Sequence, residues 1–300
     1  MISIRFQLYF ENSNTPLASV FRGNILAILQ VFDFTLGPRI LMQNRYLVWN
    51  ILCRNVASRY RGSALGFVWS FMYPLMMLSV YTFVFSVVFK ARWGAEAFSG
   101  NSASFPLLMF CGMAVFNIFS ESVNFSVGLV VSNPGFVKKV IFPLEVLPFC
   151  SVLTSLFFGL AWFALLLIGM LFFLGTVPWT ILLLPLTLAP ILLISLGVSL
   201  FVASLGVYLR DIQQVVGIVT QVLFFMTPIF YPASVVPERY RWVLELNPLS
   251  TVVDQTRNLF LFGRLPDFWP MITVYIVAVL TFQLGLVWFT NTKKGFADVL

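Results

Sequence analysis

Long apolar stretches recur along the chain, separated by turn residues and charges. At about 20 residues each, they are long enough to cross about 30 Å of hydrocarbon as helices that rise about 1.5 Å per residue. They cover approximately residues 66–89, 106–131, 147–174, 180–208, 213–231 and 269–290. The pattern predicts an all-α integral membrane protein with six transmembrane helices.

Residues 41–65 show a different, amphipathic pattern. Leu47, Val48, Ile51, Leu52 and Val56 recur at helical spacing on one side, and Arg45, Arg54, Arg59 and Arg61 fall largely off it. This is typical of a helix in the membrane interface with its arginines toward anionic headgroups, and an amphipathic helix packed on protein is the alternative. Gly62 and Gly66 then permit the turn into the first span, which we expect Pro74 to kink.

Residues 232–268 are too charged to form a span, yet they carry apolar residues at helical spacing. The pattern breaks at Asn247 and Pro248, where proline ends a helix. We expect two short extracytoplasmic helices here, outside the membrane or dipping into it. A connection of this length is more often functional than filler.

Lysine and arginine positions set the predicted orientation. Seven arginines precede residue 66, and Lys138, Lys139, Arg210, Lys293 and Lys294 lie in loops on the same predicted face. The opposite face has fewer cations, and most of them are matched by acids. Both termini are therefore predicted to be cytoplasmic, with residues 1–40 as an extension and 293–300 as a tail. The net charge of +7 reflects this topology and not nucleic-acid binding.

Composition excludes several chemistries. Apolar residues make up 60% of the chain and charged residues 10%, far from a soluble domain. With no histidine and three dispersed cysteines, no catalytic, cofactor or metal site is expected. The phosphate-binding sequence G-x-x-x-x-G-K-[ST] is absent, so ATP and Mg²⁺ would have to bind to another chain.

Four separated motifs carry a family resemblance: RYRGSALGFVWSFMYPLMMLSVYTFVFSVVF, SNPGFVKKVIFPLEVLP, YLRDIQQ, and TPIFYP followed by LNPLSTVVDQTRNLFLFG. In this order they resemble the membrane subunit of ABC-2-type polysaccharide exporters, closest to O-antigen permeases, with teichoic-acid and capsule permeases next. The resemblance covers about residues 41–294. It implies a transmembrane domain over 66–292 in a homodimer paired with two ABC ATPase subunits. The implied substrate is an undecaprenyl-pyrophosphate-linked polysaccharide, exported across the bacterial inner membrane.

The resemblance places a coupling segment at residues 132–148, which contacts the ATPase. The residues assigned to coupling are Lys138, Lys139, Phe142, Pro143, Glu145, Arg210 and Asp211. The two lysines could instead only obey the positive-inside rule.

Two sets of residues are assigned to the substrate. Arg59, Tyr60, Arg61 and Gly62 form an expected cytoplasmic entrance, since paired arginines suit a pyrophosphate. Trp69, Tyr73, Tyr81, Phe116, Phe119 and Glu121 are the expected channel set, with aromatic faces for sugar rings. Glu121 is the one acid within a predicted span, so it should face protein or a wet path; a structural hydrogen bond is the alternative.

The residues 232–268 are expected to act like an external gate, through Arg239, Tyr240, Trp242, Asn247, Pro248, Asp254 and Arg257. Among other functions, an ABC-2 permease for a small lipid, drug or haem is the first alternative. A membrane enzyme acting on lipid-linked sugars would need clustered acids, histidines or metal ligands. A secondary transporter is disfavoured by the lone intramembrane carboxylate and the lack of an evident inverted repeat.

Overall fold

The computed structural model describes residues 36–88, 104–137 and 142–300, and every regular element in these ranges is a helix. The longer helices are α3 (Leu36–Gln43), α4 (Arg45–Arg59), α5 (Trp69–Tyr81), α6 (Ser104–Val127), α8 (Val146–Phe173), α9 (Leu184–Tyr208), α10 (Ile212–Met226), α11 (Glu238–Leu246), α12 (Pro248–Phe260) and α13 (Phe268–Thr292). The short elements are η1 (Gly66–Val68), η2 (Thr82–Val88), α7 (Pro134–Val137), η3 (Trp179–Leu183), η4 (Ala233–Val235), η5 (Lys293–Gly295) and α14 (Phe296–Val299).

Within the described ranges, five helical stretches are long and apolar enough to cross a membrane. They are Gly66–Val84, Phe105–Val127, Val146–Phe173, Trp179–Tyr208 and Phe268–Val299, and they match five of the six predicted stretches. The protein is therefore a multi-pass membrane protein.

The predicted span over 213–231 is shorter than expected. Helix α10 has 15 residues, which span about 22 Å, less than the hydrocarbon thickness of about 30 Å. It ends at Met226 because Thr227 precedes a proline and adopts an extended conformation with ψ of 135°. Residues 227–230 continue as buried chain without helical structure.

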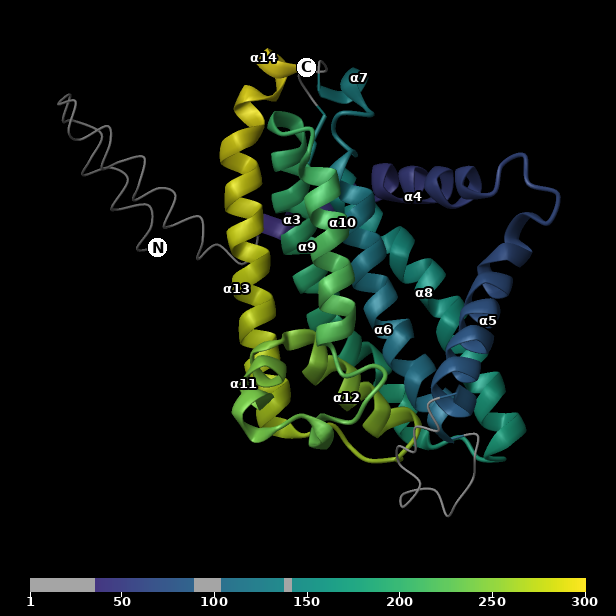
Figure 1. Cartoon of the computed structure of the whole chain (residues 1–300). Helices are drawn as coiled ribbons and strands as arrows, with labels where there is room; N and C mark the ends of the chain where they lie inside the picture. The colour runs from purple at the N-terminus through teal and green to yellow at the C-terminus, as the bar shows by residue number, and fades with distance from the viewer. Residues whose placement is uncertain (1–35, 89–103, 138–141) are drawn as a thin grey trace.

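The long helices stand side by side, with α5 at the edge of the bundle (Figure 1). Helix α6 is central and packs against α8, α9, α10 and α12. In its most apolar window 78% of the residues are buried, compared with 11% in the span that contains α5. The lateral exposure of α5 leaves one side of this helix for lipid or for another chain.

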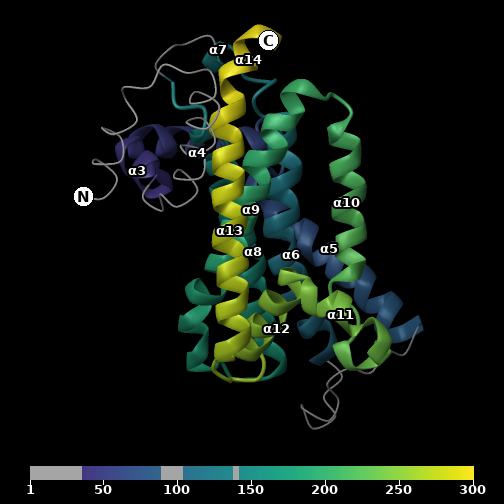
Figure 2. The ribbon, with the colours of Figure 1, turned by 90° about the vertical axis from the view of Figure 1, so that its left-hand side faces the viewer.

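The two ends of the bundle carry different short elements. Helices α7 and α14 lie at one end, together with the turn between α9 and α10, while α11 and α12 lie at the other (Figure 1). The view in Figure 2, turned by 90°, shows the same division. The expected coupling segment and the C-terminal residues thus share one end, opposite the expected gate-like helices.

Helices α9 and α13 cross with their backbones in direct contact. A Cβ atom on Gly285 would lie 2.1 Å from the Gly197 carbonyl oxygen, and one on Gly197 would lie 2.3 Å from the Thr281 carbonyl oxygen. Small residues permit such close approach between helices in membranes. This crossing fixes α13 against the bundle.

Helix α4 runs across the long helices and packs on α8 (Figure 1). Val48 and Ile51 are buried in an apolar cluster that also contains Leu147 and Phe296, while Trp49 is exposed. The alternative of packing on protein therefore holds for part of the predicted apolar face, and placement at the membrane surface stays a prediction.

The turn after α4 contains both glycines of the predicted hinge. Gly62 and Gly66 have φ angles of 84° and 51°, a left-handed backbone that glycine adopts without steric cost. Helix α5 then continues through Pro74. The chain thus changes direction between the transverse helix α4 and the long helix α5 within a few residues.

Candidate functional site

A cavity of about 270 Å³ lies where the C-terminal end of α4 meets α5, α6 and α8. Its lining residues are Arg59, Tyr60, Trp69, Ser70, Tyr73, Pro74, Asn117, Glu121, Phe158 and Trp162. The sequence assigned Arg59 and Tyr60 to an entrance, and Trp69, Tyr73 and Glu121 to a channel. The structure brings these five residues into one site.

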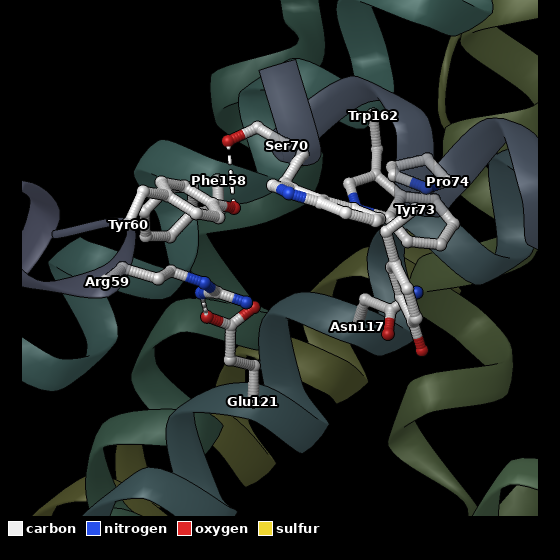
Figure 3. Close-up of a pocket in the computed structure, with 10 residues that line it drawn as sticks. Arg59, Tyr60, Ser70, Tyr73, Pro74, Asn117, Glu121, Phe158 and Trp162 are labelled. Carbon is white, nitrogen blue, oxygen red and sulfur yellow. Dashed lines mark hydrogen bonds and ion pairs between the residues drawn. The ribbon is translucent and has the colours of Figure 1, made fainter. Parts of the chain in front are cut away.

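An ion pair between Arg59 and Glu121 closes one side of this cavity (Figure 3). The Arg59 guanidinium carbon also lies 4.1 Å from the centre of the Phe158 ring, a cation–π contact. The two charged side chains are only partly buried, at 41% and 29% exposed. Glu121 thus forms a structural hydrogen bond, as one of the two alternatives held, and its partner is Arg59 at the end of α4, which the sequence did not identify.

Tyr60 holds the turn after α4 against α5 and α8. Ser70 Oγ donates a hydrogen bond of 3.0 Å to the Tyr60 hydroxyl (Figure 3). The Tyr60 ring meets Phe158 edge-on, with ring centres 5.7 Å apart. This arrangement joins the hinge to the wall of the cavity.

Aromatic side chains form another wall. Tyr73 and Trp162 lie 6.3 Å apart between ring centres, in an edge-on arrangement. Trp162 is held from behind by Phe110, which stacks on it with centres 5.2 Å apart. Packing against Phe110 already fixes the Trp162 side chain. A ligand that contacts Trp162 would therefore cost little additional side-chain entropy.

Three predicted channel residues lie elsewhere. Phe116 and Phe119 are buried at 3% and 5% exposed, and Phe116 packs on Phe224 with ring centres 5.0 Å apart. Tyr81 packs on Phe230 at 5.2 Å. The expectation that these rings line a path is not met within this chain, because they fill the contact between α5, α6 and α10.

Several cavity residues were not assigned from the sequence. Asn117 and Glu121 are four residues apart, so they share one face of α6, and this polar spacing was a usable signal. Phe158 and Trp162 have the same spacing on α8, but nothing distinguishes them from the many other apolar residues of that span. Only the packing of α8 against α5 identifies them.

The opposite end of the bundle contains a buried arginine. Arg257 of α12 is 2% exposed and donates hydrogen bonds to the carbonyl oxygens of Leu108 (3.0 Å), Pro228 (2.8 Å) and Ile229 (3.1 Å), and to Asp254 (3.2 Å). Pro228 and Ile229 belong to the non-helical chain after α10. Arg257 thus satisfies the carbonyls of Pro228 and Ile229, which have no helical partner, and gives the Leu108 carbonyl of α6 a second donor. The gate-like role expected for Arg257 stays a prediction.

The other residues of this segment divide between α11 and the start of α12. Helix α12 begins at Pro248, and the Asn247 side chain caps it by accepting a 3.0 Å hydrogen bond from the Leu249 backbone nitrogen. Arg239, Tyr240 and Trp242 are exposed on α11. The two short helices and their break at residues 247–248 are confirmed, while their location outside the cytoplasm stays a prediction.

The sequence model of the ABC-2 type transporter family matches residues 46–261, well over half of the chain and a range that includes the cavity and both short helices. The chain belongs to the ABC-2 type transporter family. It is 31% identical over 264 residues to the O-antigen export system permease protein RfbA of Myxococcus xanthus, covering 87% of this chain and 97% of the relative. The family resemblance of the four motifs is confirmed.

Two further relatives of this ABC-2 permease are more distant. RfbA of Klebsiella pneumoniae is 26% identical over 254 residues, covering 82% of this chain and 92% of the relative. The polysialic acid transport protein KpsM of Escherichia coli is 24% identical over 246 residues, with 82% and 93% coverage. The ABC-2 permease is thus similar over most of its length to O-antigen export permeases and to a polysialic acid transport protein.

The expected coupling segment of this ABC-2 permease is described only in part, since Lys138 and Lys139 lie outside the described residues. Phe136 of α7 stacks on Phe142 with ring centres 4.3 Å apart, and the Arg54 guanidinium lies 5.8 Å from the Phe136 ring centre. Pro143 is half-buried beside Phe142. The segment is thus attached to the transverse helix α4.

The remaining coupling residues differ in accessibility. Arg210 and Asp211 are exposed in the turn between α9 and α10. The Glu145 carboxylate is 4% exposed and forms an ion pair with Lys293 of η5. Direct contact with a partner, as predicted for Glu145, would require this pair to break, so the position of Glu145 supports a bracing role.

We expect the Lys293–Glu145 pair to stabilise the position of the coupling segment. Because Glu145 is buried and Lys293 is partly exposed, the coupling energy should be about 1–2 kcal/mol, between the values for exposed and for buried pairs. A double-mutant cycle with Glu145→Gln and Lys293→Met, read by thermal unfolding in detergent, measures it. Lys294→Met is the matched control. A coupling energy indistinguishable from zero would contradict the bracing role.

Among the described residues, no three His, Cys, Asp or Glu side chains lie together as a possible metal site. The described residues that line the cavity include one cation and one anion, paired with each other, and the other polar side chains carry hydroxyl, amide and indole N–H groups. Such a site can bind and orient a ligand.

Proposed function

We propose that this chain is the permease subunit of an ATP-driven exporter of a lipid-linked polysaccharide in the bacterial inner membrane. The observation that carries the proposal is the similarity to the Myxococcus RfbA protein over 97% of that relative. It is a permease of O-antigen export by name, and similarity to the polysialic acid transport protein points to polymers as well.

The polar surface of two helices supports a path formed by more than one copy. Asn124 of α6 donates a 3.2 Å hydrogen bond to Thr220 of α10, and Asn124 together with Gln214 and Gln221 of α10 is exposed. Exposed amides are costly against lipid within a span. We infer that these faces meet a water-filled path or a second copy of the chain, as in a homodimer.

The end that carries α7, α14 and the exposed Arg210–Asp211 turn is the proposed cytoplasmic end, where two copies of an ABC ATPase would dock and supply ATP and Mg²⁺. The distribution of lysine and arginine supports this orientation. It places both termini in the cytoplasm, and α11 and α12 on the external side. The cavity then lies beside the turn after α4, where the headgroup of a lipid-linked substrate would enter.

The proposal predicts that the chain forms a complex with an ATPase subunit. Co-expressed with the ATPase of the same export system, it should co-purify with it at equal stoichiometry, and lipid-linked polymer should raise the ATPase rate several-fold in proteoliposomes. The same polymer without its lipid is the matched control. A chain that purifies without an ATPase, or a rate indifferent to the lipid-linked polymer, would count against the function.

A further inference from the structure

The charge of the cavity between α4, α5, α6 and α8 argues against a phosphate ligand there. Arg59 is the one cation among its lining residues, and it is already paired with Glu121 and stacked on Phe158. A pyrophosphate bound to Arg59 would lie next to the Glu121 carboxylate, and like charges at such short range repel. The paired arginines expected to bind a headgroup are therefore not equivalent.

Arg61 is the better placed of the two for an anion. Its side chain is exposed on the turn, and within the described residues its guanidinium forms no ion pair. Arg61 follows Arg59 by two residues, and Gly62 with its φ of 84° sets the turn that carries it away from α4. A phosphate and the cavity could thus be occupied together, one beside the other.

The hydrogen-bonding groups inside the cavity suit hydroxyls. Asn117 Nδ2 donates a 3.0 Å bond to the Met113 carbonyl oxygen, which leaves its Oδ1 as an acceptor on the same face of α6 as Glu121. Arg59 supplies further N–H donors beside the Glu121 oxygens. A hydroxyl both donates and accepts, so it can use Arg59 and Glu121 at once, whereas a phosphate oxygen mainly accepts.

The size and the aromatic wall indicate a single ring. The cavity volume of about 270 Å³ is slightly below the range of about 300–1,000 Å³ for drug-sized ligands. Tyr73, Trp162 and Trp69 offer apolar surface on which the C–H face of a sugar ring can pack. A longer stretch of polymer would not fit within it.

We propose that this cavity is a binding subsite for one uncharged sugar ring, with Arg59 and Glu121 as a paired donor and acceptor for its hydroxyls. The proposal rests on the proposed function for the source of the sugar, which would be the ring next to the lipid pyrophosphate. Glu121 then has a selective role: it excludes anions from the cavity and reserves the phosphate for the exposed Arg61.

The test compares two ligands that differ in one substituent of the ring, neutral in the first and anionic in the second. Methyl α-D-glucoside and methyl α-D-glucuronide have the same ring, and the second carries a carboxylate in place of the hydroxymethyl group. Binding to the full chain in phosphatidylcholine nanodiscs is measured by saturation-transfer NMR of the ligand. We expect the glucoside to bind in the millimolar range and at least tenfold more tightly than the glucuronide. Inorganic pyrophosphate should not displace it.

Three variants locate the effect. Tyr73→Ala should weaken glucoside binding several-fold, whereas Met76→Ala, exposed on the same helix and outside the cavity, should not. Glu121→Gln should raise glucuronide affinity above that of the wild type, because Arg59 then lacks its carboxylate partner. Circular dichroism and gel filtration of each variant report whether it is folded.

Two results would overturn the subsite. One is displacement of the glucoside by pyrophosphate in the wild-type chain, which would make the cavity an anion site. The other is a glucoside signal that Tyr73→Ala and Met76→Ala change equally. Either result would leave the stimulation of the ATPase by lipid-linked polymer intact, whereas failure of the proposed function would appear in that ATPase measurement.

Discussion

Replacing Arg257 by methionine is expected to release the short helices α11 and α12 from the bundle and to destabilise the protein severely. Methionine retains much of the side-chain length but donates no hydrogen bond. The carbonyl oxygens of Pro228 and Ile229 would lose their donor, the Leu108 carbonyl of α6 would lose its second donor, and Asp254 would lose its partner. An unsatisfied buried polar group costs about 1–3 kcal/mol, so the total loss should be about 4 kcal/mol or more.

The loss should be measurable in two ways. The apparent Tm in detergent should fall by about 10 °C, at about 2–4 °C per kcal/mol for a chain of this size. Limited proteolysis should cut the segment 232–268 faster than in the wild type. Arg239→Met is the matched control, because Arg239 is exposed on α11. Wild-type stability of Arg257→Met would show that the buried contacts of Arg257 do not hold the segment.

The neighbouring Gly112 provides an independent probe of the same contact. A Cβ atom at this position would lie 2.8 Å from Arg257 Nη2. The space that glycine leaves on α6 thus admits the guanidinium of α12. Because Gly112 has no side chain, the Arg257 guanidinium has room to lie in the core beside α6.

Replacing Gly285 by alanine is expected to have the second largest effect, because the added methyl group meets backbone and not a flexible side chain. The new Cβ would lie 2.1 Å from the Gly197 carbonyl oxygen, so α9 and α13 would have to separate along their crossing. Overpacking costs about 1–3 kcal/mol, and the upper half of that range applies here because both partners are helix backbones.

The apparent Tm of Gly285→Ala should therefore fall by about 4–12 °C, at about 2–4 °C per kcal/mol. Gly128→Ala is the matched control, since no atom lies within 4 Å of a Cβ at that position. An unchanged Tm for Gly285→Ala would contradict the close packing of α9 against α13. A loss in the control of equal size would point to a general intolerance of alanine.

Helix existence and family were predictable from the sequence. Apolar stretches of about 20 residues have few alternatives to membrane helices, because every backbone polar group must be satisfied within the segment. Gly62, Gly66 and Pro248 act through their own backbone geometry, so the hinge after α4 and the start of α12 also follow from local sequence. The length of α10 was overestimated, although Pro228 was a visible signal.

The pairing of side chains that are distant in the sequence could not be predicted. Arg59 and Glu121 are 62 residues apart, and Glu145 and Lys293 are 148 apart. Sequence spacing constrains neighbours within one helix but not the rotation of one helix relative to another. Phe116 and Phe119 were expected to line a channel, but they are buried in the protein, because the rotation of α6 relative to its neighbours could not be predicted from the sequence.

The sequence by itself thus determined what each segment is: the membrane class, most of the spans, the hinge, and the two short helices with their break. The tertiary structure alone decided which charges meet, that Arg257 is buried, and that entrance and channel residues share one cavity. The physical reason is that helix formation and membrane insertion depend on local composition. Pairing between distant side chains depends on the packing of helices, which small residues such as Gly197 and Gly285 permit at particular crossings.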